Sequence, residues 1–589
     1  MNKTGIIYGV NGPVIYLKGD PGFKISEMVY VGPEKLVGEV IGLKKGMTTV
    51  QVFEETTGLK PGDTVMGTGD AISVLLGPGI IHNIFDGIQR PLEEIAKSSG
   101  KYISRGVSVD SLDTAKKWDV HVTVKVGDMV SAGTIIAETQ ETASILHKSM
   151  VPPTIGEAEV IKAVPDGAYT ILDPIVTVRL SDGSERDIAL AQKWPIRVPR
   201  PTYKRFPASV PLVTGQRILD TLFPIAKGGT AAIPGGFGTG KTMTQHAIAK
   251  WSDADLIVYI GCGERGNEMT EVLEDFSKLI DPKSGNPMMD RTVLIANTSN
   301  MPVAAREASI YTGLTLAEYY RDMGYHVAIM ADSTSRWAEA LRELSGRLEE
   351  MPAEEGFPAY LASRLSAFYE RAGMVENLNG TEGSVTIIGA VSPQGGDFSE
   401  PVTQNTKRFV RCFWGLDKNL AYSRHFPAIN WLTSYSEYLP DLASWYADNV
   451  GSDFIDDRNQ MVAILNQESS LMEIVKLIGS DVLPDDQKLT LEIARVIRLG
   501  FLQQNAFHPQ DTSVPLAKQQ KMMETILYLY EKSKALVSMG MPMSVLKEDK
   551  IFDRVISIKY DVENDRLDKF DDYKKAIDKF YDDVIARNA

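Results

Sequence analysis

The stretch GGFGTGKT, residues 235–242, constrains the fold of this chain more than any other part of its sequence. It follows an apolar segment, residues 231–233, and precedes a helix-compatible run, residues 243–251. Glycine, four further residues and then Gly-Lys-Thr form the pattern of a loop that holds phosphate groups between a strand and a helix. The sequence therefore predicts a P-loop domain with a parallel α/β sheet.

The chemistry of this loop follows from its residue types. Glycine has no Cβ, so the backbone can curl around phosphates and point its N–H groups inward. A helix that begins near Gly240 adds the partial positive charge of its N-terminus at the same place. Lys241 would reach the β and γ phosphates, and the hydroxyl of Thr242 would bind Mg²⁺.

Two carboxylates at the ends of predicted strands supply the parts needed for hydrolysis. Glu264 and Arg265 follow the apolar run 256–260, and Asp332 follows the run 326–331. We expect Glu264 to position and polarise the attacking water, and Asp332 to hold the water shell of the metal. Arg265 would stabilise charge on the transferred oxygens or pair with Glu264. The alternative role for Asp332 is that of a helix N-cap.

Composition and charge narrow the function classes. The formal net charge of -15 argues against a nucleic-acid motor such as a helicase, which normally has a basic face. Two cysteines suit a reducing compartment, and the scattered histidines show no zinc-ligand spacing. No apolar run approaches the length of a membrane span, and residues 1–5 lack the charged and then apolar regions of a secretory signal. We expect a cytoplasmic protein, peripheral on a membrane only through other chains.

A chain of 589 residues predicts about three or four domains, here a multidomain α/β protein. Short strands and turns indicate an N-terminal β-barrel over residues 1–75. A connector over residues 76–200 carries a β-rich bulge insertion at about 110–190. Residues 201–436 form the P-loop nucleotide-binding domain and residues 437–589 a C-terminal helical domain. We interpret the charged side of its helical tail, from Asp553, as a solvated face, with docking to a partner as the alternative.

One hairpin in the insertion, residues 124–136, is similar to those of biotinyl and lipoyl carrier domains. A carrier needs a lysine displayed at a tight turn. The nearest lysine, Lys148, lies in the sequence His-Lys-Ser-Met, which is a poor match for such a turn. A structural role for the insertion is therefore the favoured interpretation.

Five sequence segments together resemble the catalytic subunits of rotary ATPases. They are the loop GGFGTGKT, the run GCGERGNEM at residues 261–269, the run PAINWLTSYS at 427–436, and LGPG at 76–79 with DGIQRPL at 86–92. The bulge insertion resembles that of the V-type and A-type A subunit, which the F-type β subunit lacks. Thr239 stands where eukaryotic members usually carry cysteine, so a prokaryotic member is expected. The effect of the extra Gly236 on affinity stays open.

The resemblance implies an ATP-hydrolysing or ATP-synthesising, ion-transporting enzyme with ATP or ADP and Mg²⁺ as ligands. Three such A subunits would alternate with three B subunits in a hexameric ring, together with central-stalk and peripheral-stalk subunits and, indirectly, a membrane rotor. A B subunit would supply an arginine finger. Whether protons or sodium ions move, and in which direction the enzyme works, stays open. The implied nucleotide-binding residues are Gly235, Gly238, Thr239, Gly240, Lys241, Thr242, Met243, Phe426, Gln504, Asn505, Ala506 and Phe507.

The same resemblance assigns catalysis to Glu264, Lys241 and Arg265, and metal binding to Thr242 and Asp332, the latter through water. For the adenine pocket, aromatic stacking on Phe426 and Phe507 supports the assignment, with packing in a buried core as the alternative. Two other functions compete: a non-catalytic, nucleotide-binding structural subunit of the ring, and an F-type or secretion-system ATPase. The intact Lys241, Thr242 and Glu264 argue against the first, and the bulge insertion argues against the second.

Overall fold

The computed structural model describes residues 3–100 and 103–588. The chain forms two compact units. Unit 1 consists of Met1–Pro207, Gly228–Ala232 and Ala254–Val410. Unit 2 consists of Ala208–Lys227, Ile233–Asp253 and Arg411–Ala589. Because the chain passes between the units several times, segments far apart in the sequence meet within each unit.

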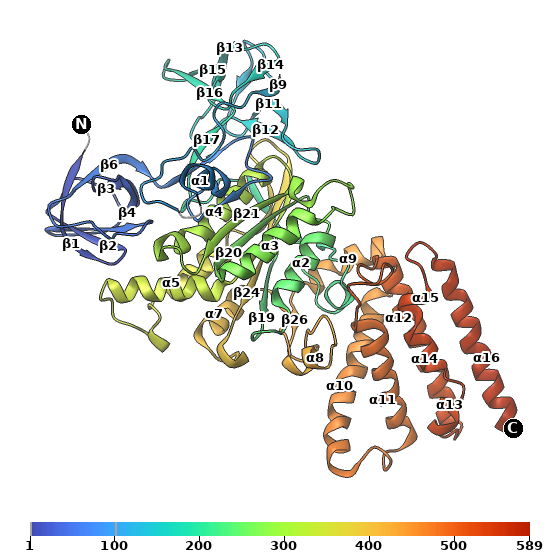
Figure 1. Cartoon of the computed structure of the whole chain (residues 1–589). Coiled ribbons are helices and arrows are strands. Elements are labelled where there is room, and N and C mark those ends of the chain that lie inside the picture. The colour runs from blue at the N-terminus through green and yellow to red at the C-terminus, as the bar shows by residue number, and fades with distance from the viewer. Residues whose placement is uncertain (1–2, 101–102, 589) are drawn as a thin grey trace. The chain divides into compact units, whose positions relative to one another are not determined.

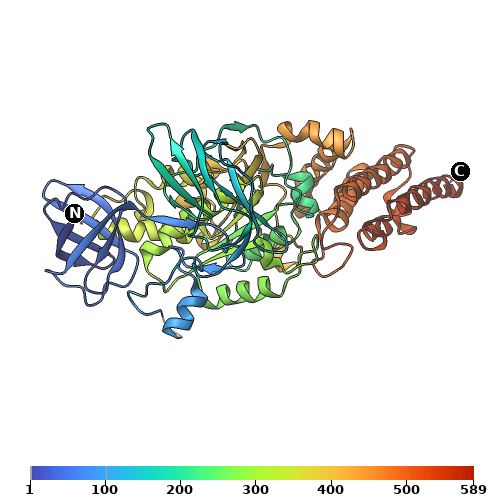
Figure 2. The same ribbon diagram turned by 90° about the horizontal axis from the view of Figure 1, so that it is seen from above.

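Unit 1 begins with the predicted β-barrel, which closes in the order β1-β2-β5-β4-β3-β6 (Figures 1 and 2). Alternate side chains point inward because successive residues of a strand face opposite sides, so Val29, Val31 and Val65 meet in one apolar core. The barrel strands are β1 Thr4–Asn11, β2 Val14–Lys18, β3 Glu27–Val31, β4 Leu36–Lys44, β5 Met47–Val52 and β6 Thr64–Ala71.

The bulge insertion contains two four-stranded sheets, β10-β13-β15-β16 and β12-β11-β9-β14. Nearby, β7 (Ser73–Leu76) pairs with β17 (Gln192–Pro195), and α1 spans Leu92–Ser99. The insertion strands are β9 Trp118–Val122, β10 Met129–Val130, β11 Ile135–Gln140, β12 Leu146–Met150, β13 Ala158–Ala163, β14 Gly167–Tyr169, β15 Pro174–Leu180 and β16 Glu185–Ala189.

A buried polar network ties the insertion to α4 (Val303–Asp322). His147 lies between Glu141, 2.9 Å from its Nδ1, and the hydroxyl of Tyr319, 3.0 Å from its Nε2. Lys148 lies in strand β12, not at a turn, and its Nζ donates to the carbonyl of Met323. These contacts give the insertion a structural role, and they place Lys148 where a carrier lysine would not be displayed.

The nucleotide-binding fold of unit 1 is built on the predicted parallel sheet. In it β8 (Ile84–Phe85), β21 (Thr292–Thr298), β20 (Leu256–Glu264), β22 (His326–Asp332) and β24 (Glu382–Val391) are neighbours in that order. These neighbours pair in parallel. β20 to β22 and β24 are buried almost throughout, which explains their near-continuous apolar sequences.

Helices and short strands complete this part of unit 1. β23 (Gly373–Glu376) pairs with β18 (Lys204–Phe206) and β24, in both cases antiparallel. α4 is buried along almost its whole length and contacts β20, β22 and β24. The other helices are α3 Gly266–Lys278, α5 Thr334–Arg347, α6 Leu361–Tyr369 and α7 Pro401–Phe409, with the single turns η2 Met288–Arg291, η3 Glu354–Gly356 and η4 Gln394–Gly396.

Unit 2 is mainly helical, as predicted for its C-terminal part. The charged tail ends in α16 (Phe570–Asn588), which packs along α12 (Leu516–Ser538) and buries Ile577 and Val584 (Figures 1 and 2). Its charged side chains include Lys574 and Asp578, which pair with Glu524 and Lys532 of α12. The other elements are η1 Ile218–Leu222, α2 Lys241–Trp251, β25 Cys412–Phe413, α8 Lys418–Tyr422, β26 Tyr435–Ser436, α9 Leu439–Asn449, α10 Phe454–Ile478, α11 Asp485–Val496, η5 Ile497–Leu502, α13 Met543–Glu548, α14 Ile551–Ile556, α15 Ile558–Asp561 and η6 Leu567–Lys569.

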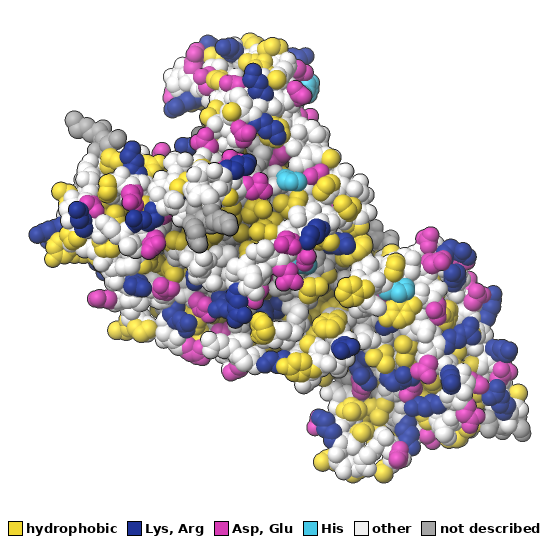
Figure 3. All heavy atoms as spheres, viewed as in Figure 1, with side chains coloured by type: hydrophobic (Ala, Val, Ile, Leu, Met, Phe, Trp, Pro, Cys, Tyr) yellow, Lys and Arg dark blue, Asp and Glu magenta, His cyan; other side chains and the backbone are white. Residues whose placement is uncertain are grey.

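The surface carries charged side chains of both signs, and the helices that the structure describes lack long apolar runs. On the face shown in Figure 3, Lys and Arg side chains over the C-terminal helices are interspersed with Asp and Glu. Within residues 3–100 and 103–588, no helix is both long and apolar enough to cross a membrane. The predicted fold class, a barrel, a β-rich insertion, an α/β nucleotide-binding fold and a helical C-terminal part, is confirmed.

Candidate active site

The phosphate-binding loop begins at the end of β19 (Thr230–Pro234) and lies in unit 2. Gly238 and Gly240 have φ angles of 75° and 91°, values that side chains with a Cβ rarely adopt. A Cβ on Gly235 would lie 2.5 Å from Oγ1 of Thr239 and 2.8 Å from Cβ of Leu416. The loop therefore needs glycine at these three positions, for backbone conformation at two and for close packing at the third.

The lysine and threonine of the loop lie at the start of α2. Gly240 precedes the helix, and Lys241 and Thr242 are its first two residues, with no acidic residue in the first turn. Nζ of Lys241 donates to the carbonyls of Gly235 (2.7 Å) and Gly236 (3.1 Å). The hydroxyl of Thr239 also donates to Gly236. The ammonium group of Lys241 and the N-terminus of α2 thus lie together at this loop, where a phosphate would bind.

Of the residues expected around the adenine, Phe426 lies beside this loop and Gln504 is hydrogen-bonded to Phe426. A Cβ on Gly240 would lie 3.8 Å from the ring of Phe426, and the amide of Gln504 donates to the carbonyl of Phe426 at 2.7 Å. Phe426 is 45% exposed and Phe507 is 93% exposed. The side chain of Gln504 is buried and bonded within the protein. Both aromatic rings are exposed, which suits stacking with a base.

The predicted catalytic carboxylates form an acidic cluster in unit 1. Glu264 ends β20 and Asp332 ends β22, and these two strands are parallel neighbours. Asp332 is 4% exposed and accepts a hydrogen bond from the hydroxyl of Tyr259 (3.1 Å). Burial, the charge of Asp332 and the hydrogen bond and charge of Glu268 raise the pKa of Glu264 to about 8. A carboxyl with such a pKa can exchange a proton near neutral pH.

Arg265 lies beside this cluster at the start of α3. It precedes the first residue of the helix, and its guanidinium is 3.9 Å from the carboxylate of Glu268, four residues after Glu264. The side chain of Arg265 is 62% exposed. The ion-pair partner is therefore Glu268, a residue of the first turn of α3.

Three further charged residues of the cluster were not identified from the sequence: Glu268, Arg306 and Arg336. The guanidinium charge of Arg336 lowers the pKa of Glu264 and partly offsets the other effects. A Cβ on Gly263 would lie 2.8 Å from Cδ of Arg306 and 3.1 Å from Cβ of Arg336, so only glycine fits between them. Glu268 could have been identified because it follows Glu264 by four residues. Arg306 and Arg336 could not, because they come from the separate helices α4 and α5.

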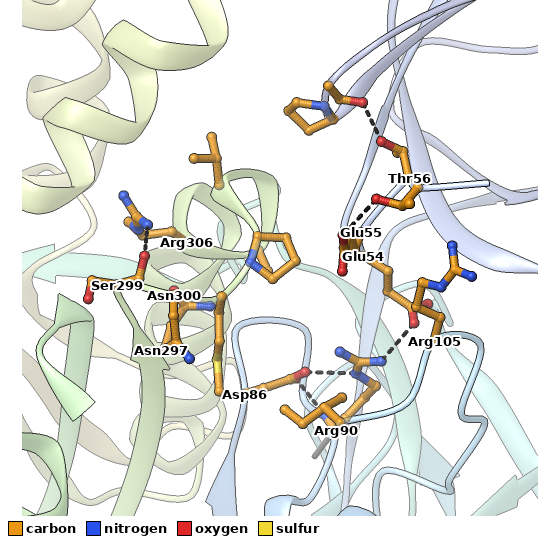
Figure 4. Close-up of a pocket in the computed structure, with 18 of the residues that line it drawn as sticks. Glu54, Glu55, Thr56, Asp86, Arg90, Arg105, Asn297, Ser299, Asn300 and Arg306 are labelled. Carbon is orange, nitrogen blue, oxygen red and sulfur yellow. Dashed lines mark hydrogen bonds and ion pairs between the residues drawn. The ribbon is translucent and has the colours of Figure 1, made fainter. Parts of the chain in front are cut away.

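A pocket of about 790 Å³ lies elsewhere in unit 1, between the barrel and the ends of β21 and α4 (Figure 4). Arg306 is in its wall and donates to the carbonyl of Ser299. Arg90 pairs with Asp86 and Glu54, which neutralises its charge. The pocket contains none of the predicted nucleotide-binding or catalytic residues, so its size does not make it the nucleotide site.

Sequence identity to known proteins shows the family of this chain. It is 60% identical over 582 residues to "V-type ATP synthase alpha chain 2" of Clostridium tetani, covering 99% of this chain and 98% of that protein. The chain belongs to the family of V-type and A-type ATP synthase alpha chains. A V-type alpha chain of Halothermothrix orenii is also 60% identical, and an A-type ATP synthase chain of Methanopyrus kandleri is 54% identical over 99% of this chain and 98% of its own length.

Family models match consecutive parts of the chain. Residues 215–436 match the nucleotide-binding domain of the ATP synthase alpha/beta family, and residues 443–545 match the C-terminal domain of V and A type ATP synthase. Residues 109–197 match the alpha/beta subunit barrel-sandwich domain, and residues 7–69 the β-barrel domain. The family resemblance expected from the sequence, including a prokaryotic member, is confirmed.

One solved structure shows the same fold at low identity. The type III secretion ATPase EscN of enteropathogenic E. coli has a TM-score of 0.62, covering 89% of this chain and 99% of its own. At 21% identity this similarity concerns the fold alone. The high identity to V-type and A-type chains therefore outweighs the alternative of a secretion-system ATPase.

Proposed function

We propose that this chain is the catalytic subunit of a rotary ATPase, which hydrolyses or synthesises ATP and is coupled to ion transport across a membrane. Its relatives are named as chains of V-type or A-type ATP synthases. One observation carries the catalytic assignment: a half-buried carboxyl at the end of β20, Glu264, has its pKa raised to about 8 and lies beside the buried carboxyl of Asp332 at the end of the neighbouring strand β22. A purely structural nucleotide site has no use for such a group.

The loop of unit 2 supports binding of ATP and ADP through their phosphates. Amides of residues 235–240 and the ammonium of Lys241 would bind phosphate oxygens, with Lys241 exchanging its bonds to Gly235 and Gly236 for bonds to the ligand. Phe426 and Phe507 would stack on the adenine. Arg265, which is largely exposed, would add a guanidinium for phosphate oxygens.

The available oxygen donors fit Mg²⁺. Thr242 offers a hydroxyl and Asp332 a buried carboxylate, and oxygen is the ligand atom Mg²⁺ prefers. Within residues 3–100 and 103–588 no cluster of three or more His, Cys, Asp or Glu forms a metal cage. That agrees with an ion held by few protein groups and by substrate phosphates. When bound, the ion would neutralise charge that develops on the phosphate oxygens.

Glu264 would direct the chemistry. Its carboxylate accepts a hydrogen bond from a water, and takes the proton as the water oxygen forms a bond to the γ-phosphorus. The bond between that phosphorus and the β–γ bridging oxygen breaks, which gives ADP and inorganic phosphate. Lys241 and the loop amides would hold the transferred oxygens during this step.

The family forms part of a multisubunit ATP synthase, and we propose specific partners within it. B subunits would alternate with three copies of this chain and supply an arginine finger, with central-stalk and peripheral-stalk subunits attached. The negative net charge supports the absence of a nucleic-acid partner. The chain would be cytoplasmic and peripheral on the membrane through the rest of the complex.

Replacing Glu264 with Gln in the assembled complex tests the catalytic assignment. ATP binding should remain and steady-state turnover should fall by about a thousandfold or more, because the water loses its proton acceptor. Glu271→Gln, on the exposed side of the adjoining helix α3, is the matched control and should keep its turnover. Unchanged turnover in the Glu264→Gln complex would instead support a non-catalytic, structural subunit.

A further inference from the structure

A fully buried guanidinium, that of Arg217, lies behind the segment expected to contact the adenine. Arg217 comes directly before η1, and its side chain is 0% exposed. It donates to the carbonyl of Phe501 through Nε, to the carbonyl of Gln503 through Nη2 (2.7 Å) and to the carboxylate of Asp511 through Nη1. All these residues belong to unit 2.

A second buried cation acts on the same stretch of chain. Nζ of Lys559, from α15, donates to the carbonyls of Leu499 (2.6 Å) and Gln503 (3.2 Å). These carbonyls lie in and just after the last turn of η5, where backbone acceptors have no partner further along the helix. Arg217 and Lys559 therefore donate hydrogen bonds to the backbone carbonyls at the end of η5. These bonds hold the chain in place where η5 ends.

The chain that follows is attached at both ends. The side chain of Gln504 donates to the carbonyl of Gly215 (2.9 Å) and accepts from the amide of Arg217 (2.9 Å). The carboxylate that pairs with Arg217, that of Asp511, also accepts from the amide of Asn505 (2.6 Å). These three hydrogen bonds restrain the start of the loop, and its most exposed residue is Phe507.

This attachment also sets the distance to the phosphate-binding loop. The amide of Gln504 donates to Phe426, whose ring lies beside Gly240. A shift of the segment 503–507 would therefore move Phe507 and Phe426 relative to the helix that carries Lys241.

We propose that Arg217 is a positioning residue for the adenine: with Asp511 and Lys559 it holds the segment 503–507 in the conformation that binds the base. The proposal rests on the proposed function, since it takes ADP or ATP as the ligand. Because its side chain is fully buried, Arg217 would touch neither the base nor the phosphates. Its effect is pre-organisation, so that binding does not have to order Asn505 and Phe507.

Calorimetry on the full chain with Mg-ADP and Mg-pyrophosphate separates this role from general destabilisation. The two ligands share their phosphates and differ in the nucleoside. Arg217→Lys keeps the positive charge but loses the planar guanidinium, whose N–H groups donate in several fixed directions. Lys559→Met removes the hydrogen bonds to the carbonyls of Leu499 and Gln503. Each should weaken Mg-ADP binding by about tenfold while Mg-pyrophosphate binding changes by less than about twofold. Lys521→Met, a lysine paired with Glu524 on α12, is the control and should leave both affinities unchanged.

The outcomes are distinct. Unchanged Mg-ADP affinity in folded variants, or equal losses for both ligands, would overturn the positioning role. If Arg217→Lys does not fold, judged by its thermal unfolding transition, Lys559→Met decides alone. A wild-type chain that binds pyrophosphate as tightly as ADP would overturn the adenine pocket itself, a failure visible without any variant. Loss of binding for both ligands in Lys241→Ala confirms that the phosphate-binding loop is the site being measured.

Discussion

Glu264 should control how the rate of ATP hydrolysis depends on pH. Burial, the charge of Asp332 and the interactions of Glu268 raise its pKa from an ordinary 4.5 to about 8. At pH 7, about one chain in ten therefore carries Glu264 as the carboxylate, because each pH unit below the pKa lowers that fraction about tenfold. If the carboxylate takes the proton of the attacking water, kcat/KM should rise with pH up to about 8 and then level off.

The perturbation that tests this reasoning is Glu268→Gln. It removes one of the charges that raise the pKa of Glu264, so that pKa should fall and the rising limb of the profile should move to lower pH. Near pH 7 the variant should have a larger share of its maximal kcat/KM than the wild type. Glu271→Gln, on the exposed side of the same helix, is the control and should leave the limb in place.

The assay is kcat/KM of the assembled complex for Mg-ATP, measured from about pH 6 to about pH 9 at constant free Mg²⁺ and ionic strength, because kcat/KM reports the free enzyme. A profile that is flat through this range would refute the role of Glu264 as proton acceptor. A limb that moves to higher pH in Glu268→Gln would refute the electrostatic account of its pKa.

Three further predictions concern the separate chain and its fold. The isolated chain should bind ATP but hydrolyse it at least about a thousandfold more slowly than the assembled complex, because the arginine finger comes from a neighbouring subunit. Comparable hydrolysis rates for the two would contradict the prediction of an arginine finger in the neighbour. Gly240→Ala should lower the free energy of unfolding by about 1 kcal/mol and weaken nucleotide binding, because φ is 91° at this position. The control, Gly346→Ala inside α5, should not destabilise the chain. Equal effects of the two variants in denaturant titrations would argue against backbone strain. The folded-state pKa of Glu264 is raised, so its contribution to stability is present below pH 4.5 and is lost as pH rises to about 8. Glu264→Gln should therefore raise the melting temperature at pH 8 more than at pH 4.5, and the opposite order would contradict the raised pKa of this carboxyl.

Local sequence patterns were sufficient for the strands and for the loop. The continuous apolar runs that became β20, β21 and β22 have few alternatives to strands buried on both faces. The glycines of the loop were readable because positive φ angles and close packing exclude other residues at these positions. Glu264 and Asp332 could be identified because the carboxyl ends of parallel strands share one edge of the sheet.

Contacts between distant segments could not be read in this way. Arg217 and Asp511 are 294 positions apart, and nothing in the sequence around Arg217 distinguishes a buried clamp from a surface arginine. Arg306 and Arg336 reach Gly263 from two different helices, so their proximity depends on how α4 and α5 pack. The charged tail was predicted to be helical with a solvated face, but its sequence did not show that the apolar side of α16 packs against α12.

The central claim is that Glu264 performs chemistry and is not needed to hold the nucleotide. Its most direct test is a single-turnover experiment, in which the assembled complex is mixed with less Mg-ATP than it has sites and the bound nucleotide is identified after acid quench. We predict that the wild-type complex converts bound ATP to ADP, whereas the Glu264→Gln complex keeps it as ATP at similar occupancy. Conversion at the wild-type rate by the variant would contradict the account.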